Sequence, residues 1–311
     1  MSHVLYLPLF TTNHHLDPML SHVIQGRPTL PPELISHIVS CIDSRDTSTL
    51  QSLSLTSTHF VAPSQSLLFS HITLSGSDTQ DTNPSPSSPS KKLLSLLKST
   101  PRIIGYIKHL TISDAEGGYS SWLPNENTLL EVVNCLNLSS LKSFSIIRHF
   151  NATWLLLAPD VKRALLKILS GACNIEELEL KHVPLSLLSS CSSKKLKGLR
   201  LFHPQVASVE SIEAFAGDIS NEKRRVQLER LNMWHQWDLD QLTNWLLGAQ
   251  SHINLTGLRV LDVVAMRPVD YSEITKVLKV CRALQEFKMS ICADEEGIVS
   301  EFDCPALLFA H

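Results

Sequence analysis

The sequence predicts an α/β protein in which a small helical module precedes a longer array of parallel strands. Two observations carry this prediction: a proline-led apolar segment that begins at Leu30, and an apolar motif that returns seven times after residue 93. The 311 residues, 43% hydrophobic and 18% charged, are enough for sizeable packed cores. A net charge of −3 gives no electrostatic basis for a nucleic-acid partner.

The cysteines and the hydropathy of the chain indicate its compartment. Seven cysteines are scattered without a Cys-x-x-Cys pair, which is typical of reduced thiols in an intracellular protein. No stretch approaches the roughly 20 apolar residues that a membrane helix needs. We therefore expect a soluble protein of the cytoplasm or nucleus, with no membrane partner and no cofactor.

The helical module begins with Leu30-Pro31-Pro32-Glu33-Leu34-Ile35. Proline fits the first turn of a helix because its missing N–H has no partner there. Glu33 lies where the helix dipole favours a carboxylate. A module this small can bury only part of its apolar stripe, so the remainder must cover a partner or the neighbouring array. The stripe comprises Leu34, Ile35, Ile38, Val39 and Ile42.

Composition suggests four parts. Residues 1–27 have no period and are expected to be flexible, and residues 28–74 form the helical module. Residues 75–92 contain no apolar side chain and are predicted to be a Ser/Pro-rich linker or disordered loop. In this segment Ser85 and Ser88 each precede a proline, so they are either phosphorylation sites or plain linker residues. Residues 93–311 form the array.

The array repeats an apolar residue, two of any kind, an apolar residue, one of any kind and another apolar residue. One such motif is a weak signal, but seven in series indicate stacked strand units, because each unit cannot bury its apolar face alone. The alternative is an ordinary α/β domain, although none of the 11 glycines forms a phosphate-binding turn. The motifs are Ile107-x-x-Leu110-x-Ile112, Leu141-x-x-Phe144-x-Ile146, Ile175-x-x-Leu178-x-Leu180, Leu196-x-x-Leu199-x-Leu201, Leu228-x-x-Leu231-x-Met233, Leu258-x-x-Leu261-x-Val263 and Leu284-x-x-Phe287-x-Met289.

Most intervals between motifs have helical patterns. Pro159-Asp160 opens a helix over 161–170, with Gly171 as its stop. Asp270 and Glu273 resemble a capping box before Ile274. The Ser-rich interval after Ile175 is too short for a long helix, so we expect a loop or one helical turn there.

Residues 30–74 resemble an F-box of the fungal type. Leu30 to Ile35 is similar to the first helix of the family, Asp46 to Ser57 to its second segment, and Leu67 to Leu74 to its close, which runs into a first strand. The repeats behind it resemble degenerate leucine-rich repeats. The resemblance implies a solenoid with parallel strands on its concave face and helices or loops on its convex face.

The same resemblance implies a function. F-box proteins are substrate receptors that bind the Skp-family adaptor, and through it cullin, in SCF-type ubiquitin ligases. It implies adaptor contacts from Leu30, Pro31, Leu34, Ile38 and Leu50. The alternatives are a helical cap that only shields the first repeat, and a leucine-rich interaction scaffold without a ligase role.

The residues between the apolar positions of each motif should line the concave sheet. Phe202 and Trp234 occupy equivalent positions of neighbouring units, and Trp and Arg are enriched at binding hot spots. We therefore predict that Arg200, Phe202, Arg230, Trp234 and Asp262 bind an unknown substrate protein. Alternatively, Trp234 folds under a loop with Trp237 as a satellite core.

No sequence motif predicts catalysis or a metal. His182, His203 and His235 occupy equivalent places, but no carboxylate or cysteine pattern completes a ligand set, so we interpret them as strand-end residues that hydrogen-bond a turn. Nucleophile elbows, phosphate loops and zinc motifs are missing from the sequence. We expect a non-enzyme; the remaining alternative is a hydrolase with an unrecognised triad.

Overall fold

The structure is a computed structural model, and it describes residues 30–76, 88–114, 122–148, 154–205, 225–234, 239–248, 251–265, 270–293 and 298–302. The chain divides into two compact units, residues 1–68 and 69–311. The expected flexible segment 1–27 lies outside the described residues.

Unit 1 contains three helices, α1 (Pro32–Ser40), α2 (Thr47–Thr56) and α3 (Thr58–Leu68). Helix α1 begins directly after Pro31, as the two prolines predict. Asp46 caps α2 by accepting a hydrogen bond from the Thr49 backbone N–H at 3.1 Å, and hydrogen bonding to Thr49 lowers the pKa of the Asp46 carboxyl. The buried apolar side chains of these helices are Ile35, Val39 and Leu50.

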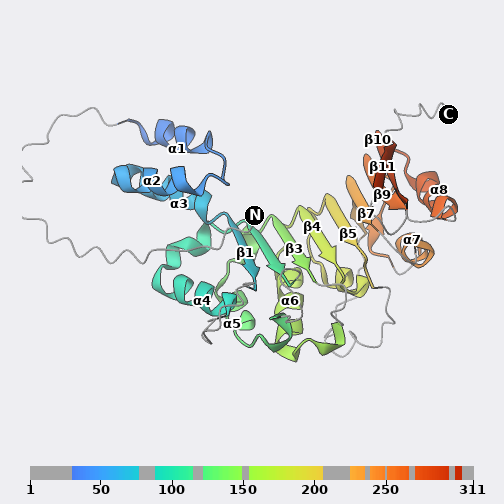
Figure 1. The fold of residues 1–311 in the computed structure, drawn as a ribbon, viewed down its shortest axis with the longest axis horizontal. Helices are drawn as coiled ribbons and strands as arrows, with labels where there is room; N and C mark the ends of the chain where they lie inside the picture. The colour runs from blue at the N-terminus through green and yellow to red at the C-terminus, as the bar shows by residue number, and fades with distance from the viewer. Residues whose placement is uncertain are drawn as a thin grey trace, which may run out of the picture. The chain divides into compact units, whose positions relative to one another are not determined.

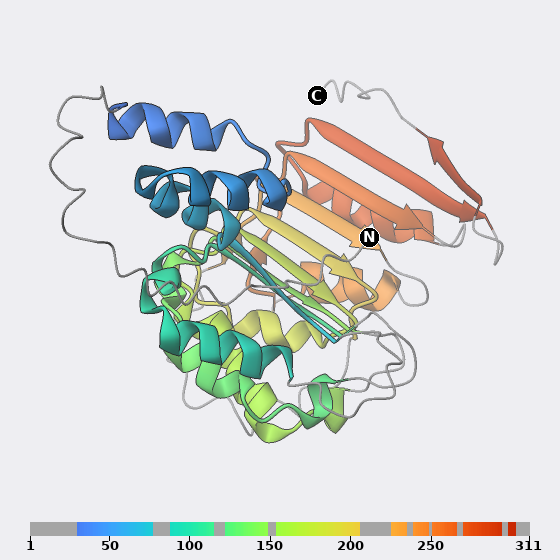
Figure 2. The ribbon, with the colours of Figure 1, turned by 60° about the vertical axis from the view of Figure 1, so that its left-hand side comes forward.

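Unit 2 is an α/β structure built on a mostly parallel nine-stranded sheet (Figures 1 and 2). The strands lie side by side in chain order, and only the last pair is antiparallel. They are β1 (His71–Ser75), β2 (His109–Ser113), β3 (Ser143–Ile147), β4 (Glu177–Lys181), β5 (Gly198–Phe202), β7 (Arg230–Trp234), β9 (Val260–Ala265), β10 (Glu286–Ala293) and β11 (Ile298–Phe302). A separate parallel pair joins β6 (Val226–Gln227) to β8 (Ile253–Asn254).

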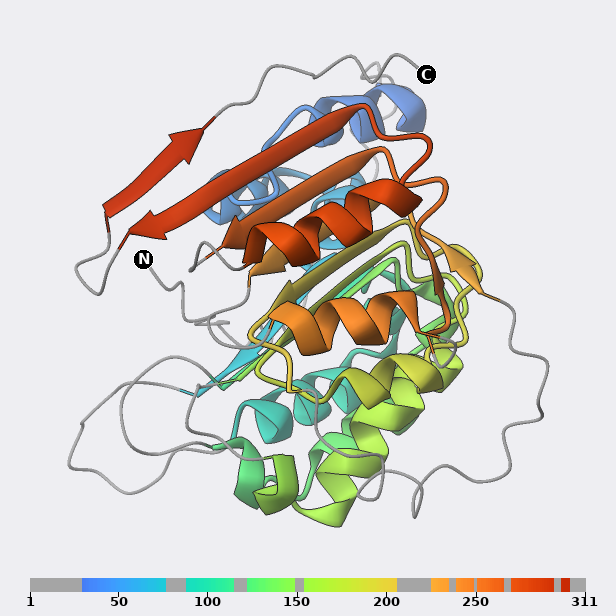
Figure 3. The same cartoon turned by 90° about the vertical axis from the view of Figure 1, so that its right-hand side faces the viewer.

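The motif explains why each strand forms where it does. Its first apolar residue, such as Leu141, is buried just before the strand, and the next two, such as Phe144 and Ile146, are buried on one face of it. The apolar residues of the last motif are only half-buried, and a 3-10 helix takes the place of a long helix between β4 and β5. Five of the described helices cover that face of the sheet (Figures 1 and 3). They are α4 (Pro89–Ser99), α5 (Leu129–Cys135), α6 (Pro159–Gly171), α7 (Leu239–Leu247) and α8 (Asp270–Val280).

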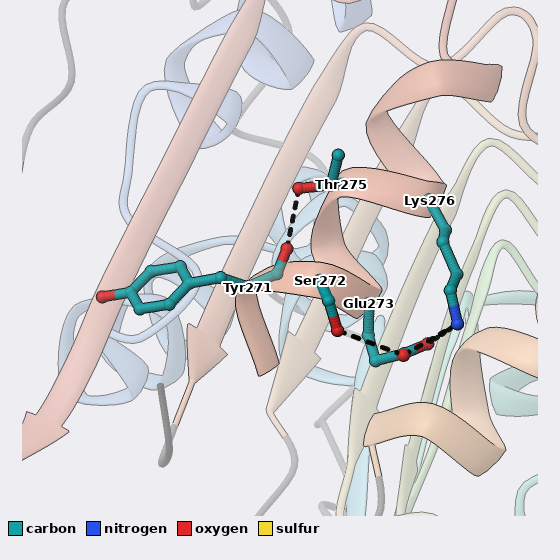
Figure 4. Close-up of polar contacts among 5 residues, drawn as sticks. All are labelled: Tyr271, Ser272, Glu273, Thr275 and Lys276. Carbon is teal, nitrogen blue, oxygen red and sulfur yellow. Dashed lines mark hydrogen bonds and ion pairs between the residues drawn. The ribbon is translucent and has the colours of Figure 1, made fainter. Parts of the chain in front are cut away.

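The predicted helices after Pro159 and Asp270 are confirmed by α6 and α8. On α8 the Lys276 ammonium reaches both carboxylate oxygens of Glu273 at 2.8 and 2.9 Å, and the Thr275 hydroxyl donates to the Tyr271 carbonyl at 2.8 Å (Figure 4). The short interval after Ile175 contains one 3-10 helix, as its length predicts. The 3-10 helices are Pro101–Gly105, Leu123–Asn125, Leu138–Ser140, Trp154–Leu156 and Leu185–Ser190.

The structure differs from the sequence prediction at both ends of the linker and near the C-terminus. Ser75 is the last residue of β1, and α4 already begins at Pro89, so only 76–88 lies between these elements. Residues 77–87, including Ser85, lie outside the described part. Strand β11 turns back antiparallel on β10, which the repeat pattern did not predict.

Candidate functional site

Helix α1 carries apolar side chains on two faces. Ile35 and Val39 point into unit 1 and are buried. Leu34 and Ile38 are 49% and 43% exposed, and their spacing of four residues places them on one face of α1. Leu30, which is 49% exposed, lies before the N-cap Pro31 and therefore outside the helix. We call these three residues the α1 stripe; Leu34 and Ile38 belong to the apolar stripe named in the sequence analysis, and Leu30 precedes it.

The predicted adaptor contacts separate into two groups in the structure. Leu30, Pro31, Leu34 and Ile38 are exposed. Leu50 is completely buried, so its side chain holds α2 in the core of the module and cannot touch a partner. The prediction failed at Leu50 because α2 alternates Ser, Thr and Leu, and this weak amphipathic pattern does not settle which leucine faces inward.

The second candidate surface is the sheet face opposite the helices of unit 2, which we call the open face. Parallel pairing in register places equivalent motif positions side by side, so the open face has three rows. The first and middle rows are mostly polar, with Gly198 and Val260 as the exceptions in the first row. The last comprises Ile147, Lys181, Phe202, Trp234 and Val264, which are cross-strand partners in that order.

The aromatic pair predicted from the sequence is present on this face. The ring centroids of Phe202 and Trp234 are 5.8 Å apart at an interplanar angle of 48°, and Trp234 is 39% exposed. Trp237, which the alternative packed beside Trp234, lies outside the described residues. All five predicted substrate-binding residues, Arg200, Phe202, Arg230, Trp234 and Asp262, lie on the open face of neighbouring strands.

One ion pair on this surface depends on the space that Gly198 leaves open. The Glu177 carboxylate lies over Gly198 and reaches Arg230 two strands away, where it accepts a hydrogen bond from the guanidinium. A Cβ at Gly198 would collide with that carboxylate. The Arg230 guanidinium therefore already has an ion-pair partner within the chain. Asp262 is also engaged, because it accepts a hydrogen bond from the Asn232 amide at 3.0 Å.

The groove beside this ion pair has a volume of about 290 Å³. Serine hydroxyls and charged side chains line it, and Ser145 donates to Glu179 at 3.3 Å at its floor. The polar and charged lining residues are His109, Lys142, Ser143, Ser145, Glu176, Glu177, Glu179 and Arg200.

One serine–histidine pair in the groove bears on the hydrolase alternative. His109 Nδ1 is 3.0 Å from the Ser143 hydroxyl, and the His109 ring stacks on His71 at 4.0 Å. Burial, the charge of His71 and the charge of Lys142 lower the pKa of His109 to about 4. An imidazole with that pKa is a weak general base at neutral pH, so the pair gives little support to a hydrolase.

A third group of residues follows the strand ends, and sequence reasoning found only part of it. Arg148 is completely buried and Asp114 nearly so; burial lowers the pKa of Arg148 and the nearby Asp114 charge raises it. His182 and His203 stack at 4.9 Å, with φ of 53° and 46° in the left-handed region. Asp114 and Arg148 occupy the same motif position as these histidines, and they were missed because only the histidines at that position were considered.

The histidines do not form a metal centre with their neighbours. The backbone N–H of His182 donates to the Phe202 carbonyl at 2.9 Å, and that of His203 donates to the Trp234 carbonyl at 2.8 Å. Within the described ranges no three His, Cys, Asp or Glu side chains are grouped to hold an ion. His235 lies outside those ranges. The described helices also include none that is long and apolar enough to cross a membrane.

Comparison with known proteins adds no relationship. No family model matches the chain, and no curated protein matches it.

Proposed function

We propose that this chain is a non-catalytic substrate receptor of an SCF-type cullin–RING ubiquitin ligase. In this proposal unit 1 is an F-box-like module that binds a Skp-family adaptor, and unit 2 is a leucine-rich-repeat solenoid that binds the target protein. The observation that carries the proposal is the α1 stripe: three large apolar side chains, at and just before the start of α1 and along one of its faces, that are exposed.

The form of the sheet supports the second half of the proposal. The sheet strands follow chain order, and the described helices of unit 2 cover one face of the sheet. This arrangement is typical of a repeat array and not of a doubly wound sheet, whose strand order reverses at a switch point. Such an array leaves its other face to a ligand. Here that face carries the half-exposed aromatic pair Phe202 and Trp234.

The mechanism would be proximity. The ligase performs the transfer of ubiquitin, and this chain raises the local concentration of one target near it. The chain then needs two independent binding surfaces and no reactive group, which agrees with the α1 stripe and the open face lying on separate units.

Co-purification with a Skp-family adaptor tests the first surface. The full chain should retain the adaptor, and the double substitution Pro31→Ala with Leu34→Asp should release it, because a carboxylate would enter an apolar contact without a partner. Ser36→Asp is the matched control: it places the same group on α1 at an exposed position outside the stripe.

The outcomes separate the candidate functions. No association, or association that survives the double substitution, would remove the ligase proposal. An interaction scaffold without adaptor binding would then be the better account, since the open face does not depend on α1.

A further inference from the structure

The last row of the open face forms an apolar band across five neighbouring strands. Strands lie about 4.8 Å apart, so the band from Ile147 to Val264 is about 19 Å long. Lys181 is the one charged member of this row, and it is half-buried between Ile147 and Phe202. A partner that packs closely on both apolar neighbours would restrict the access of water to the Lys181 ammonium.

The charged side chains beside this band differ in whether they form hydrogen bonds or ion pairs within the chain. On β4, β5, β7 and β9 the open-face carboxylates each accept a hydrogen bond: Glu177 from Arg230, Glu179 from Ser145 and Asp262 from Asn232. Lys181 and Arg200 are the two cations there that have no ion pair or side-chain hydrogen bond among the described residues. Both cations adjoin Phe202: Lys181 is its cross-strand partner, and Arg200 precedes it by two residues on β5.

We propose that the open face binds a protein segment that presents an Asp or Glu side chain beside a large apolar side chain. The apolar side chain would lie on Phe202 and Trp234, and the carboxylate would accept hydrogen bonds from Lys181 and Arg200. These two are diagonal cross-strand neighbours, roughly 7 Å apart at Cβ, so their long side chains can meet on one carboxylate.

Physical chemistry favours an acidic segment over the other choices. A purely apolar segment would desolvate Lys181 without supplying a counter-charge, which costs binding energy. A basic segment would need the carboxylates, which already accept bonds from neighbouring strands, and it would be repelled by Lys181 and Arg200. The inference rests on the proposed function in that this segment would belong to the ligase target.

Selection from a library of short random peptides displayed on phage, with the full chain as bait, tests the inference. Recovered peptides should be enriched in Asp or Glu beside Trp, Phe or Leu. Resynthesis of a recovered peptide with Asn in place of Asp should weaken binding about tenfold, as expected for loss of a charge-assisted hydrogen bond. Trp234→Ala should abolish binding and leave the melting temperature nearly unchanged, because the side chain is exposed.

Charge reversal provides the sharper comparison. Lys181→Glu with Arg200→Glu should select Lys- or Arg-containing peptides instead, whereas Lys194→Glu, an exposed lysine on the loop before β5, should select as the natural chain does. The inference is overturned if no peptide is recovered, if acidic residues are not enriched among the recovered peptides, or if the charge-reversed chain keeps the preference of the natural chain.

Adaptor binding measured on the same preparations keeps the two proposals apart. Adaptor binding without acidic selection would remove this inference and leave the receptor proposal intact. Acidic selection without adaptor binding would support this recognition chemistry and remove the ligase role.

Discussion

At the scale of single residues, His109 makes the stability of the protein depend on pH. Its pKa is about 4 in the folded chain and 6.5 in the unfolded reference, so the unfolded chain binds more protons between these values. This contribution to stability is complete above pH 6.5 and is lost as the pH falls to about 4. Because the ring is only half-buried, solvent screening reduces the contribution to about 1 kcal/mol.

The substitution His109→Gln measures this contribution. Urea unfolding at a series of pH values should show a smaller loss of free energy for the variant than for the natural chain between pH 6.5 and about pH 4. Equal losses in the two chains would show that His109 does not titrate in this window. His71→Gln is a useful comparison, since it removes the stacked ring and leaves His109 in place.

The buried charge at Arg148 gives a second prediction at this scale. Asp114→Asn keeps the size of the side chain but removes the charge that opposes the buried guanidinium. Leaving a buried charge uncompensated costs roughly 3 kcal/mol, so the free energy of unfolding should fall by about that amount. Chemical denaturation of the variant checks this, and an unchanged denaturation midpoint would contradict the buried pairing.

The positions of single residues were predicted well where they occupy equivalent places in consecutive motifs. Phe202 and Trp234 occupy the same place in consecutive motifs, and in-register parallel pairing converts that sequence equivalence into contact. Leu50 was misplaced because one short helix gives little information on its own rotation. Asp114 and Arg148 stand seven residues after Ile107 and Leu141, which is the position that His182 and His203 occupy in their motifs, so the repeat could have identified them as neighbours.

At the scale of elements, α4 depends on its cap. The Ser88 hydroxyl accepts a hydrogen bond from the Lys91 N–H at 3.2 Å, and Pro89 opens the first turn. Ser88→Ala should lower the free energy of unfolding by about 1 kcal/mol, whereas Ser88→Asp should keep the cap and cost little. Thermal unfolding of both variants tests this, and equal stability of the two would show that the cap is dispensable.

The elements show which sequence signals are reliable. The seven motifs predicted seven strands because buried apolar spacing reports directly on the sheet. The start of α4 was missed because a polar, Ser/Pro-rich segment was interpreted as linker, although a serine before a proline is also a helix start. Strand β11 was missed because it pairs antiparallel and does not repeat the motif.

At the scale of the whole molecule, the central claim is that one chain holds two separate binding surfaces, the α1 stripe on unit 1 and the open face on unit 2. The seven repeats of the apolar motif made the parallel sheet predictable from the sequence. The chemistry of the open face was harder to predict, because it depends on which charges are engaged across strands. Glu177 reaching Arg230 over Gly198 is one such contact.

The most direct test of the central claim is calorimetric titration of the full chain with a purified Skp-family adaptor. We expect binding in roughly the micromolar range or tighter, weakened at least about tenfold by Leu34→Asp and by Ile38→Asp and unchanged by Ser36→Asp. Absence of binding by the natural chain, or equal affinities for all four proteins, would contradict the central claim.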